Sequence, residues 1–222
     1  MKAMILAAGR GERMRPLTDH TPKPLLEVGG KSLIIWHLER LAKAGFKEVV
    51  INHAHLGEQI EQALGNGSQW GLNIQYSPEK IALETAGGIA NALPLLGDAP
   101  FLVVNGDTFS EIDFTALKLL PNHLAHLVLV DNPSQHPNGD FSIENGLLKN
   151  DGEHKLTFSG IGIYQPALFV DIVRGEPAKL APLLRLAIVQ NKATAQHYQG
   201  VWHDIGTPAR LHDLDVQLKS QR

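Results

Sequence analysis

Residues 4–17 have the sequence Met4-Ile-Leu-Ala-Ala-Gly-Arg-Gly-Glu-Arg-Met-Arg-Pro-Leu17, and they indicate both the fold and the chemistry of this chain. The apolar run at the start predicts a buried β-strand. The run ends at two small residues and a Gly-x-Gly turn, and because glycine has no Cβ, the backbone N–H groups of Gly9 and Gly11 can approach a ligand closely. The turn also carries Arg10 and Arg13. Backbone N–H groups beside guanidinium groups suit a phosphate.

A lysine on a restrained loop follows this turn. Lys23 stands between Pro22 and Pro24, and each proline restricts the backbone next to it. The ammonium group is therefore expected to be held in a fixed place. The Gly-x-Gly turn, Arg13 and Lys23 together predict a nucleoside-triphosphate site, whereas a glycine-rich turn without a ligand would need neither cation.

Two better-known phosphate-binding loops do not fit this stretch. A P-loop ends in Gly-Lys-Ser or Gly-Lys-Thr, and the turn has no such ending. A dinucleotide-binding fingerprint needs a third glycine where Met14 stands and an acidic residue at the end of the next strand, where Asn52 stands. The same differences argue against a Rossmann dehydrogenase.

The composition is that of a globular protein. Of the 222 residues, 43% are hydrophobic and 19% are charged. The net charge of −3 gives no reason to expect nucleic acid or an anionic membrane surface as a partner, and no apolar run approaches the roughly 20 residues of a membrane-spanning helix. The chain has no cysteine, which excludes disulfides and cysteine-bound metals. The cytoplasm is the expected location.

Strand-like and helix-like segments alternate through the first half of the chain. Strands are predicted near residues 4–6, 48–52, 73–76 and 101–104, where short apolar runs occur. Helices are predicted over 32–44, 57–64 and 85–93 from apolar spacing and capping residues. This alternation predicts an α/β fold with a doubly wound, mostly parallel sheet, in which ligands bind at the carboxyl ends of the strands.

The second half has a looser pattern. Strands are predicted at 127–130, 141–143, 156–158 and from residue 201, and helices at 179–190 and 208–218. The Asn-, Gly- and Asp-rich segment between residues 132 and 163 predicts a small antiparallel subregion, which is expected to form a wall beside the second substrate. No linker is evident, so residues 1–222 are expected to form a single domain. Residues 1–120 are expected to be its nucleotide-binding half, and residues 121–222 the half that binds the second substrate.

Two aspartates follow predicted strands. Asp107 ends the motif Asn-Gly-Asp after one strand, and Asp204 follows a later one in Trp-His-Asp-Ile-Gly-Thr. Mg²⁺ is typically held by one or two carboxylates, with waters and substrate phosphates completing the octahedron. Either aspartate alone could simply cap a turn, but the pair predicts a magnesium site. His53-x-His55 is not expected to bind zinc, because no third ligand follows at a useful spacing.

These motifs resemble those of the sugar-1-phosphate nucleotidyltransferases. The resemblance rests on Leu-Ala-Ala-Gly-x-Gly-x-Arg-Met-x-Pro-Leu at residues 6–17 and Lys-Pro-Leu at 23–25, with Glu12 departing from the usual Thr or Ser. Later motifs extend it over nearly the whole chain. Within the family, the chain is most similar to the short uridylyltransferases that act on N-acetylmuramate 1-phosphate in cell-wall (peptidoglycan) recycling. The stretches behind this closer similarity are 51–54, 83–85, 103–107, 127–133 and 179–185.

The resemblance implies an activity and a set of site residues. The activity is a Mg²⁺-dependent transfer of UMP from UTP to a sugar 1-phosphate, with release of pyrophosphate. The implied catalytic residues are Arg13, Lys23 and Asp107, and the implied metal ligands are Asp107 and Asp204. The implied nucleotide-binding residues are Ala8, Gly9, Gly11, Glu12, Arg13, Lys23, Leu83 and Gly87, with the base contacted near Leu83 and a Gly87-Gly88 turn. The implied sugar-phosphate-binding residues are Asn105, Gly139 and Asp140.

The motifs specify the type of reaction more closely than they specify its two substrates. Many thymidylyltransferases have a glutamine a few residues before Gly87, where this chain has Glu79, Lys80 and Ile81, so the base stays open. The cation for the sugar phosphate is also open, with residues 153–155 and Lys179 as candidates. The alternative activities are glucose-1-phosphate thymidylyl-, mannose-1-phosphate guanylyl- and phosphocholine cytidylyltransferase. A non-catalytic sensor of nucleotide sugars would not need Arg13, Lys23 and both aspartates. A monomer or a small homo-oligomer is expected.

Overall fold

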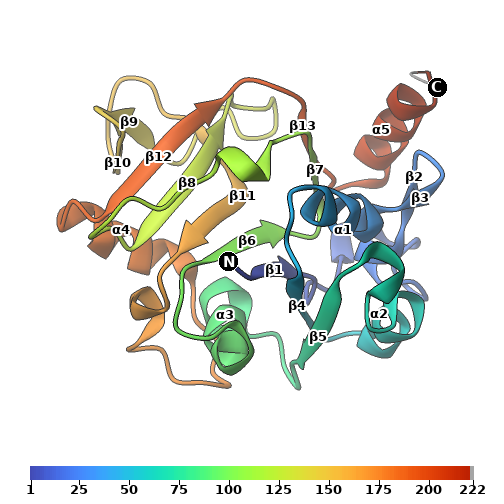
Figure 1. Cartoon of the computed structure of the whole chain (residues 1–222). Coiled ribbons are helices and arrows are strands. Elements are labelled where there is room, and N and C mark those ends of the chain that lie inside the picture. Colours follow the sequence, from blue (N-terminus) through green and yellow to red (C-terminus); the bar gives the residue numbers. More distant parts are fainter. Residues whose placement is uncertain (221–222) are drawn as a thin grey trace.

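The computed structural model describes residues 1–220. Its centre is a nine-stranded sheet with the strand order β5-β4-β1-β6-β11-β8-β12-β10-β9 (Figure 1). The strands are β1 (Ala3–Leu6), β4 (Glu48–His53), β5 (Asn73–Pro78), β6 (Phe101–Asn105), β8 (Ala125–Val130), β9 (Ser142–Glu144), β10 (Leu147–Lys149), β11 (Thr157–Tyr164) and β12 (Ala193–Tyr198).

All strands run in the same direction in the first half of the sheet, whereas the second half contains both directions. Strands β5, β4, β1 and β6 pair in parallel. Strand β11 runs antiparallel between β6 and β8, while β12 is parallel to β8 and is followed by antiparallel β10 and β9. The prediction of an α/β, mostly parallel sheet with antiparallel strands in the second half is confirmed.

Helices cover both faces of this sheet. The helices are α1 (Leu33–Lys43), α2 (Gly57–Leu64), α3 (Glu84–Leu96), α4 (Leu180–Val189) and α5 (Pro208–Ser220). Met4 of β1 belongs to one hydrophobic core with residues of α3 and α4, and Ile5 belongs to another core with residues of α1 and α2. Strand β1 is therefore buried on both faces, which explains its continuous apolar run.

Two small antiparallel sheets lie outside the central one. One pairs β2 (Glu27–Val28) with β3 (Lys31–Ser32), and the other pairs β7 (Thr108–Ser110) with β13 (Trp202–Asp204). The C-terminal helix α5 packs beside β2, as Figure 1 shows. Helix α5 thereby returns to the segment that follows the Gly9–Gly11 turn.

Besides the short strands β2, β3, β7 and β10, where no element was predicted, two further segments differ from the prediction. The sequence pattern predicts no element at 193–198, but β12 forms there, because its polar residues find partners inside the sheet: Thr194 Oγ1 lies 2.9 Å from His126 Nδ1. The helix predicted over 85–93 is confirmed, so the turn that the resemblance implied at Gly87-Gly88 is wrong, since both glycines lie within α3. Within residues 1–220, no helix is both long and apolar enough to cross a membrane.

One buried histidine should make stability depend on pH. The His37 side chain, on α1, is 2% exposed, and its Nε2 has no hydrogen-bond partner in the described structure. Burial, helped by the Arg40 guanidinium, lowers the pKa of His37 from 6.5 to about 4. Between these two pH values the unfolded chain binds more protons than the native state, so stability decreases as pH falls through this window.

We expect the free energy of unfolding to fall by about 3 kcal/mol more in the wild type than in His37→Leu between pH 7 and pH 4. Urea unfolding at the two pH values measures the difference. The exposed His55 provides a matched control, and His55→Leu should follow the wild type. Equal pH dependence in wild type and His37→Leu would contradict the prediction.

Candidate active site

A cavity of about 270 Å³ opens at the carboxyl ends of β1, β4 and β6. These ends lie together because Leu6 is in register with Asn52 on one side and with Asn105 on the other. The position is the one at which doubly wound sheets bind ligands. The lining residues are Leu6, Ala7, Ala8, Gly9, Lys23, Pro24, Asn52, Glu79, Ala82, Leu83, Glu84, Thr85, Asn105, Gly106 and Asp107.

An ion pair stands at the edge of this cavity. Lys23 begins the short 3-10 helix η2 (Lys23–Leu25), directly after Pro22. Its Nζ donates to Asp107 Oδ2 over 2.7 Å. The lysine is 7% exposed, whereas the Asp107 side chain is 38% exposed. The charge-assisted hydrogen bond fixes the ammonium group against the loop that follows β6.

A buried polar network lies under the cavity. Asn52 Oδ1 accepts the N–H of Ala7 over 3.0 Å, and Asn52 Nδ2 donates to Glu79 Oε1 over 2.7 Å. The other oxygen of Glu79 accepts the N–H of Leu83 over 3.1 Å. Burial raises the pKa of Glu79, and the hydrogen bonds from Asn52 and Leu83 oppose that rise. The network joins the ends of β1 and β4 to the start of α3.

Asn52→Ala is expected to lower the free energy of unfolding by about 3 kcal/mol, because it leaves the Ala7 N–H and the Glu79 carboxyl without their buried partner. Thermal or urea unfolding measures this loss. The control is Asn73→Ala on the exposed edge of β5, which should lower the free energy of unfolding far less. Similar losses for the two variants would show that the network adds little to stability.

A second cavity, of about 350 Å³, adjoins the first, and Asn105 and Asp107 line both. Its other lining residues come from β7, β11, β13, the loop between β8 and β9 and, for Arg13, the short 3-10 helix η1 (Glu12–Met14). They are Arg13, Thr108, Pro133, Gln135, His136, Asp140, Thr157, Phe158, Ser159, Gly160, Trp202 and Asp204.

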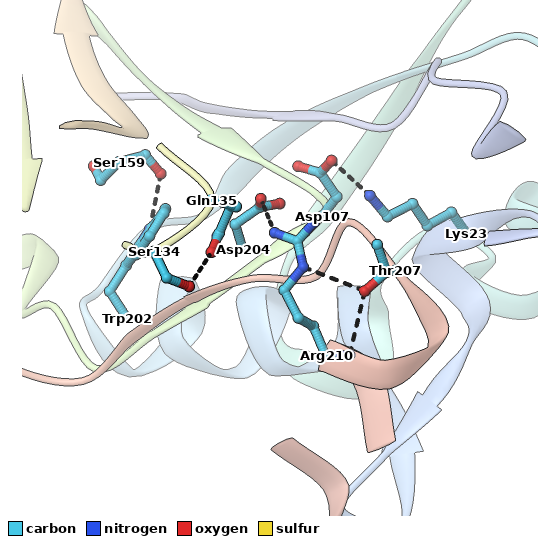
Figure 2. A network of polar contacts seen from close by, with 9 residues as sticks. All are labelled: Lys23, Asp107, Ser134, Gln135, Ser159, Trp202, Asp204, Thr207 and Arg210. Carbon is cyan, nitrogen blue, oxygen red and sulfur yellow. Dashed lines mark hydrogen bonds and ion pairs between the residues drawn. The ribbon is translucent and has the colours of Figure 1, made fainter. Parts of the chain in front are cut away.

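Pairing of β13 with β7 brings the two aspartates together. Asp204 is in register with Thr108, and the N–H of Ile205 donates to the Asp107 carbonyl over 2.9 Å. The Asp204 carboxylate forms an ion pair with Arg210 in the first turn of α5. Figure 2 shows both ion pairs side by side, Lys23 with Asp107 and Arg210 with Asp204.

The nucleotidyl transferase family matches residues 2–221 of the chain. The chain belongs to this family. It is 60% identical to the N-acetylmuramate alpha-1-phosphate uridylyltransferase of Neisseria meningitidis serogroup B, over 97% of each chain. It is 34% identical to the enzyme of the same name from Caulobacter vibrioides, over 97% of this chain and 96% of the relative. The resemblance inferred from the motifs is confirmed.

A solved structure of another protein shows the same fold. HddC from Yersinia pseudotuberculosis superposes with a TM-score of 0.78 at 20% identity, over 98% of this chain and 99% of that one. At this coverage the likeness includes the central sheet and its flanking helices, so the two proteins share one fold over nearly the whole chain.

The structure brings most of the predicted site residues together. Ala8, Gly9, Lys23 and Leu83 line the first cavity, and Arg13, Asp140 and Asp204 line the second, with Asn105 and Asp107 common to both. Gly11, Glu12, Gly87 and Gly139 line neither. Glu12 and Arg13 lie in the exposed 3-10 helix η1 (Glu12–Met14).

Two of the predicted glycines have steric roles. The N–H groups of Ala86 and Gly87 donate to the Ala178 carbonyl over 2.9 and 3.1 Å, and a Cβ on Gly87 would clash with the Glu176 carbonyl. The Gly87 N–H is therefore already engaged. Gly139 has φ +60°, and a Cβ there would lie 2.8 Å from Asn132 Oδ1. A side chain at either position would push neighbouring backbone apart.

Neither predicted candidate cation for the sugar phosphate lines the second cavity. Residues 153–155 line a separate hollow with Asp131 and Asn132. Lys179 is exposed at the N-cap position of α4. The cavity contains Arg13 and His136 instead.

The sequence reading missed two charged groups of the site. Arg210 lies six residues after Asp204, but a basic residue early in a helix gives no local sign of an ion pair. Glu79 was noted only for not being glutamine, and its buried bond to Asn52 joins two strand ends. Both partnerships arise from tertiary contacts.

Proposed function

We propose that the protein transfers the uridylyl group of UTP to N-acetylmuramate 1-phosphate, giving UDP-N-acetylmuramate and pyrophosphate. The observation behind this proposal is that Asp107 lines both cavities. A nucleotide in the first cavity and a sugar phosphate in the second would meet beside Asp107 and Lys23. The relatives from N. meningitidis and C. vibrioides are named for this reaction, which supports these substrates over the thymidylyl, guanylyl and cytidylyl alternatives.

The reaction brings two anions together. An oxygen of the sugar phosphate forms a bond to the α-phosphorus of UTP, while the bond from that phosphorus to the α–β bridging oxygen breaks and its electron pair leaves with pyrophosphate. No covalent enzyme intermediate is needed, so catalysis depends on alignment and on neutralising charge. In our proposal, Lys23 Nζ contacts the α-phosphate. Arg13 has no ion-pair or hydrogen-bond partner through its side chain among residues 1–220, and it lines the second cavity from η1, which directly follows Gly11. From there it would bind the departing pyrophosphate together with the Gly9–Gly11 turn.

Asp107 and Asp204 fit a magnesium ion. They line one cavity from adjoining segments, and one oxygen of each carboxylate has no hydrogen-bond partner in the described residues. Two carboxylates with water and phosphate oxygens are a donor set that suits Mg²⁺. Residues 1–220 contain no group of three or more His, Cys, Asp or Glu side chains that could hold a metal, so phosphates would complete the site. When bound, the ion neutralises phosphate charge and polarises the P–O bonds.

The remaining assignments follow from this reaction. Residues 1–120 would form the nucleotide-binding half of a single domain, with Ala8, Gly9 and Leu83 near the nucleoside. Residues 121–222 would form the sugar-phosphate-binding half, with Asn105 between the two. We assign the protein to peptidoglycan recycling in the cytoplasm, as a monomer or small homo-oligomer.

The test is a matrix of substrates. The purified protein is incubated with Mg²⁺, each of the four nucleoside triphosphates and a panel of sugar 1-phosphates, and pyrophosphate is measured. The highest rate is expected with UTP and N-acetylmuramate 1-phosphate, and none without Mg²⁺. A higher rate with another pair would change the substrates, and no release with any pair would favour a nucleotide-sugar sensor.

A further inference from the structure

The second cavity contains a histidine that the proposed reaction does not use. His136 lies on the loop between β8 and β9 and lines the cavity on the side of the antiparallel strands. Its side chain is 43% exposed. A ligand in the cavity can therefore reach the imidazole.

The protein holds this histidine in one place. Its Nε2 lies 3.1 Å from Asp140 Oδ1, and the other oxygen of Asp140 accepts the N–H of Phe158 over 2.8 Å. The loop is closed by Asn132, whose Nδ2 donates to the carbonyls of Pro137 and Lys155. Because Nε2 donates to a carboxylate, which can only accept, Nδ1 is left for a ligand.

One basic side chain that lines the second cavity has no role in the proposed reaction. The charged or titratable side chains among its lining residues are Arg13, Asp107, His136, Asp140 and Asp204. Asp107 and Asp204 are proposed to hold the metal, which would neutralise the sugar phosphate, Arg13 is proposed to bind pyrophosphate, and Asp140 is bonded to His136. A further negative charge on the sugar would therefore find His136 as its partner.

N-acetylmuramate carries such a charge. It differs from N-acetylglucosamine by a lactyl ether on the sugar ring, which ends in a carboxylate. We propose that His136 binds this lactyl carboxylate and so selects N-acetylmuramate 1-phosphate, an inference that rests on the function proposed above. The imidazolium donates Nε2–H to Asp140 and Nδ1–H to the lactyl carboxylate, and each contact is a charge-assisted hydrogen bond.

The experiment compares two acceptors that differ in charge. They are N-acetylmuramate 1-phosphate and its lactyl methyl ester, which keeps the shape and removes the charge. The wild type should prefer the acid by about 10- to 100-fold in kcat/KM, the value of one hydrogen bond to a charged group. The His136→Gln substitution should lower kcat/KM for the acid and leave kcat/KM for the ester unchanged, so that the preference for the acid disappears. His136→Lys keeps a positive charge and should retain the preference. His212→Gln, at an exposed position of α5, should behave as the wild type.

The outcomes separate the two proposals. Equal losses on acid and ester in His136→Gln would indicate a structural role and overturn the inference, as would an unchanged preference for the acid. Either result leaves the uridylyltransferase proposal standing if the wild type still uses the acid. A wild type that uses neither acceptor, or does not distinguish them, would overturn the inference, and use of neither would also refute the proposed function.

Discussion

Asp107→Asn is expected to lower kcat by about 10²- to 10³-fold, the range for removing one preorganised electrostatic group. The substitution removes a negative charge that both cavities share, together with the carboxylate that binds Lys23. It also removes one of the two proposed metal ligands, so half-maximal activity should require more Mg²⁺. The measurement is pyrophosphate release at saturating UTP and sugar phosphate over a series of Mg²⁺ concentrations.

The matched control is Asp213→Asn, on the exposed face of α5, which should leave both quantities unchanged. The melting temperature of each variant shows whether the fold is retained, since asparagine occupies the space of aspartate but leaves Lys23 without its ion pair. Near-wild-type turnover of a folded Asp107→Asn would remove the metal assignment. The proposed convergence of the two substrates at Asp107 would then lose its support.

Lys23→Ala is also expected to lower kcat by about 10²- to 10³-fold. The η2 helix and the bond to Asp107 hold the ammonium group in place before the substrates arrive, so it can stabilise the charge that shifts onto phosphate oxygens during transfer without a costly rearrangement. The measurement is the full dependence of rate on UTP concentration, which separates kcat from KM.

The control for this variant is Lys31→Ala, which breaks an ion pair with Glu39 away from the cavities. Lys23→Ala should remain folded, because the Asp107 carboxylate it leaves unpaired is open to solvent and stays hydrated. A rise in KM with unchanged kcat would show that Lys23 binds the ground state and transition state equally. That result would exclude the proposed role in the transfer step.

Local chemistry explains why much of the site was predictable. Three features of the site depend only on residues adjacent in the sequence, so they can be seen in it directly. They are a glycine without a Cβ, a proline with a fixed φ and a lysine between two prolines. The placement of Gly9 and Asp107 after strands, at the carboxyl ends where such sheets bind ligands, also follows from the alternation of strands and helices. The turn implied at Gly87-Gly88 is instead helix, as the 85–93 pattern predicted, and what the sequence did not show is that the 176–178 segment packs on Gly87 while Gly88 lies against Glu79 and Asn52.

The amino-acid sequence by itself determined the parallel half of the sheet, the Gly9–Gly11 turn and the restrained loop that carries Lys23, because periodicity and backbone restriction are local properties. Only the tertiary structure decided which groups share a site: Asp204 beside Asp107, Arg210 on Asp204, Glu79 on Asn52 and His136 on Asp140. Two of these four pairs, Asp204 with Asp107 and Glu79 with Asn52, join separate strands or strand ends, whereas Arg210 and His136 meet their partners through local loop and helix geometry. Such contacts depend on the relative placement of elements, which no local pattern of residues specifies.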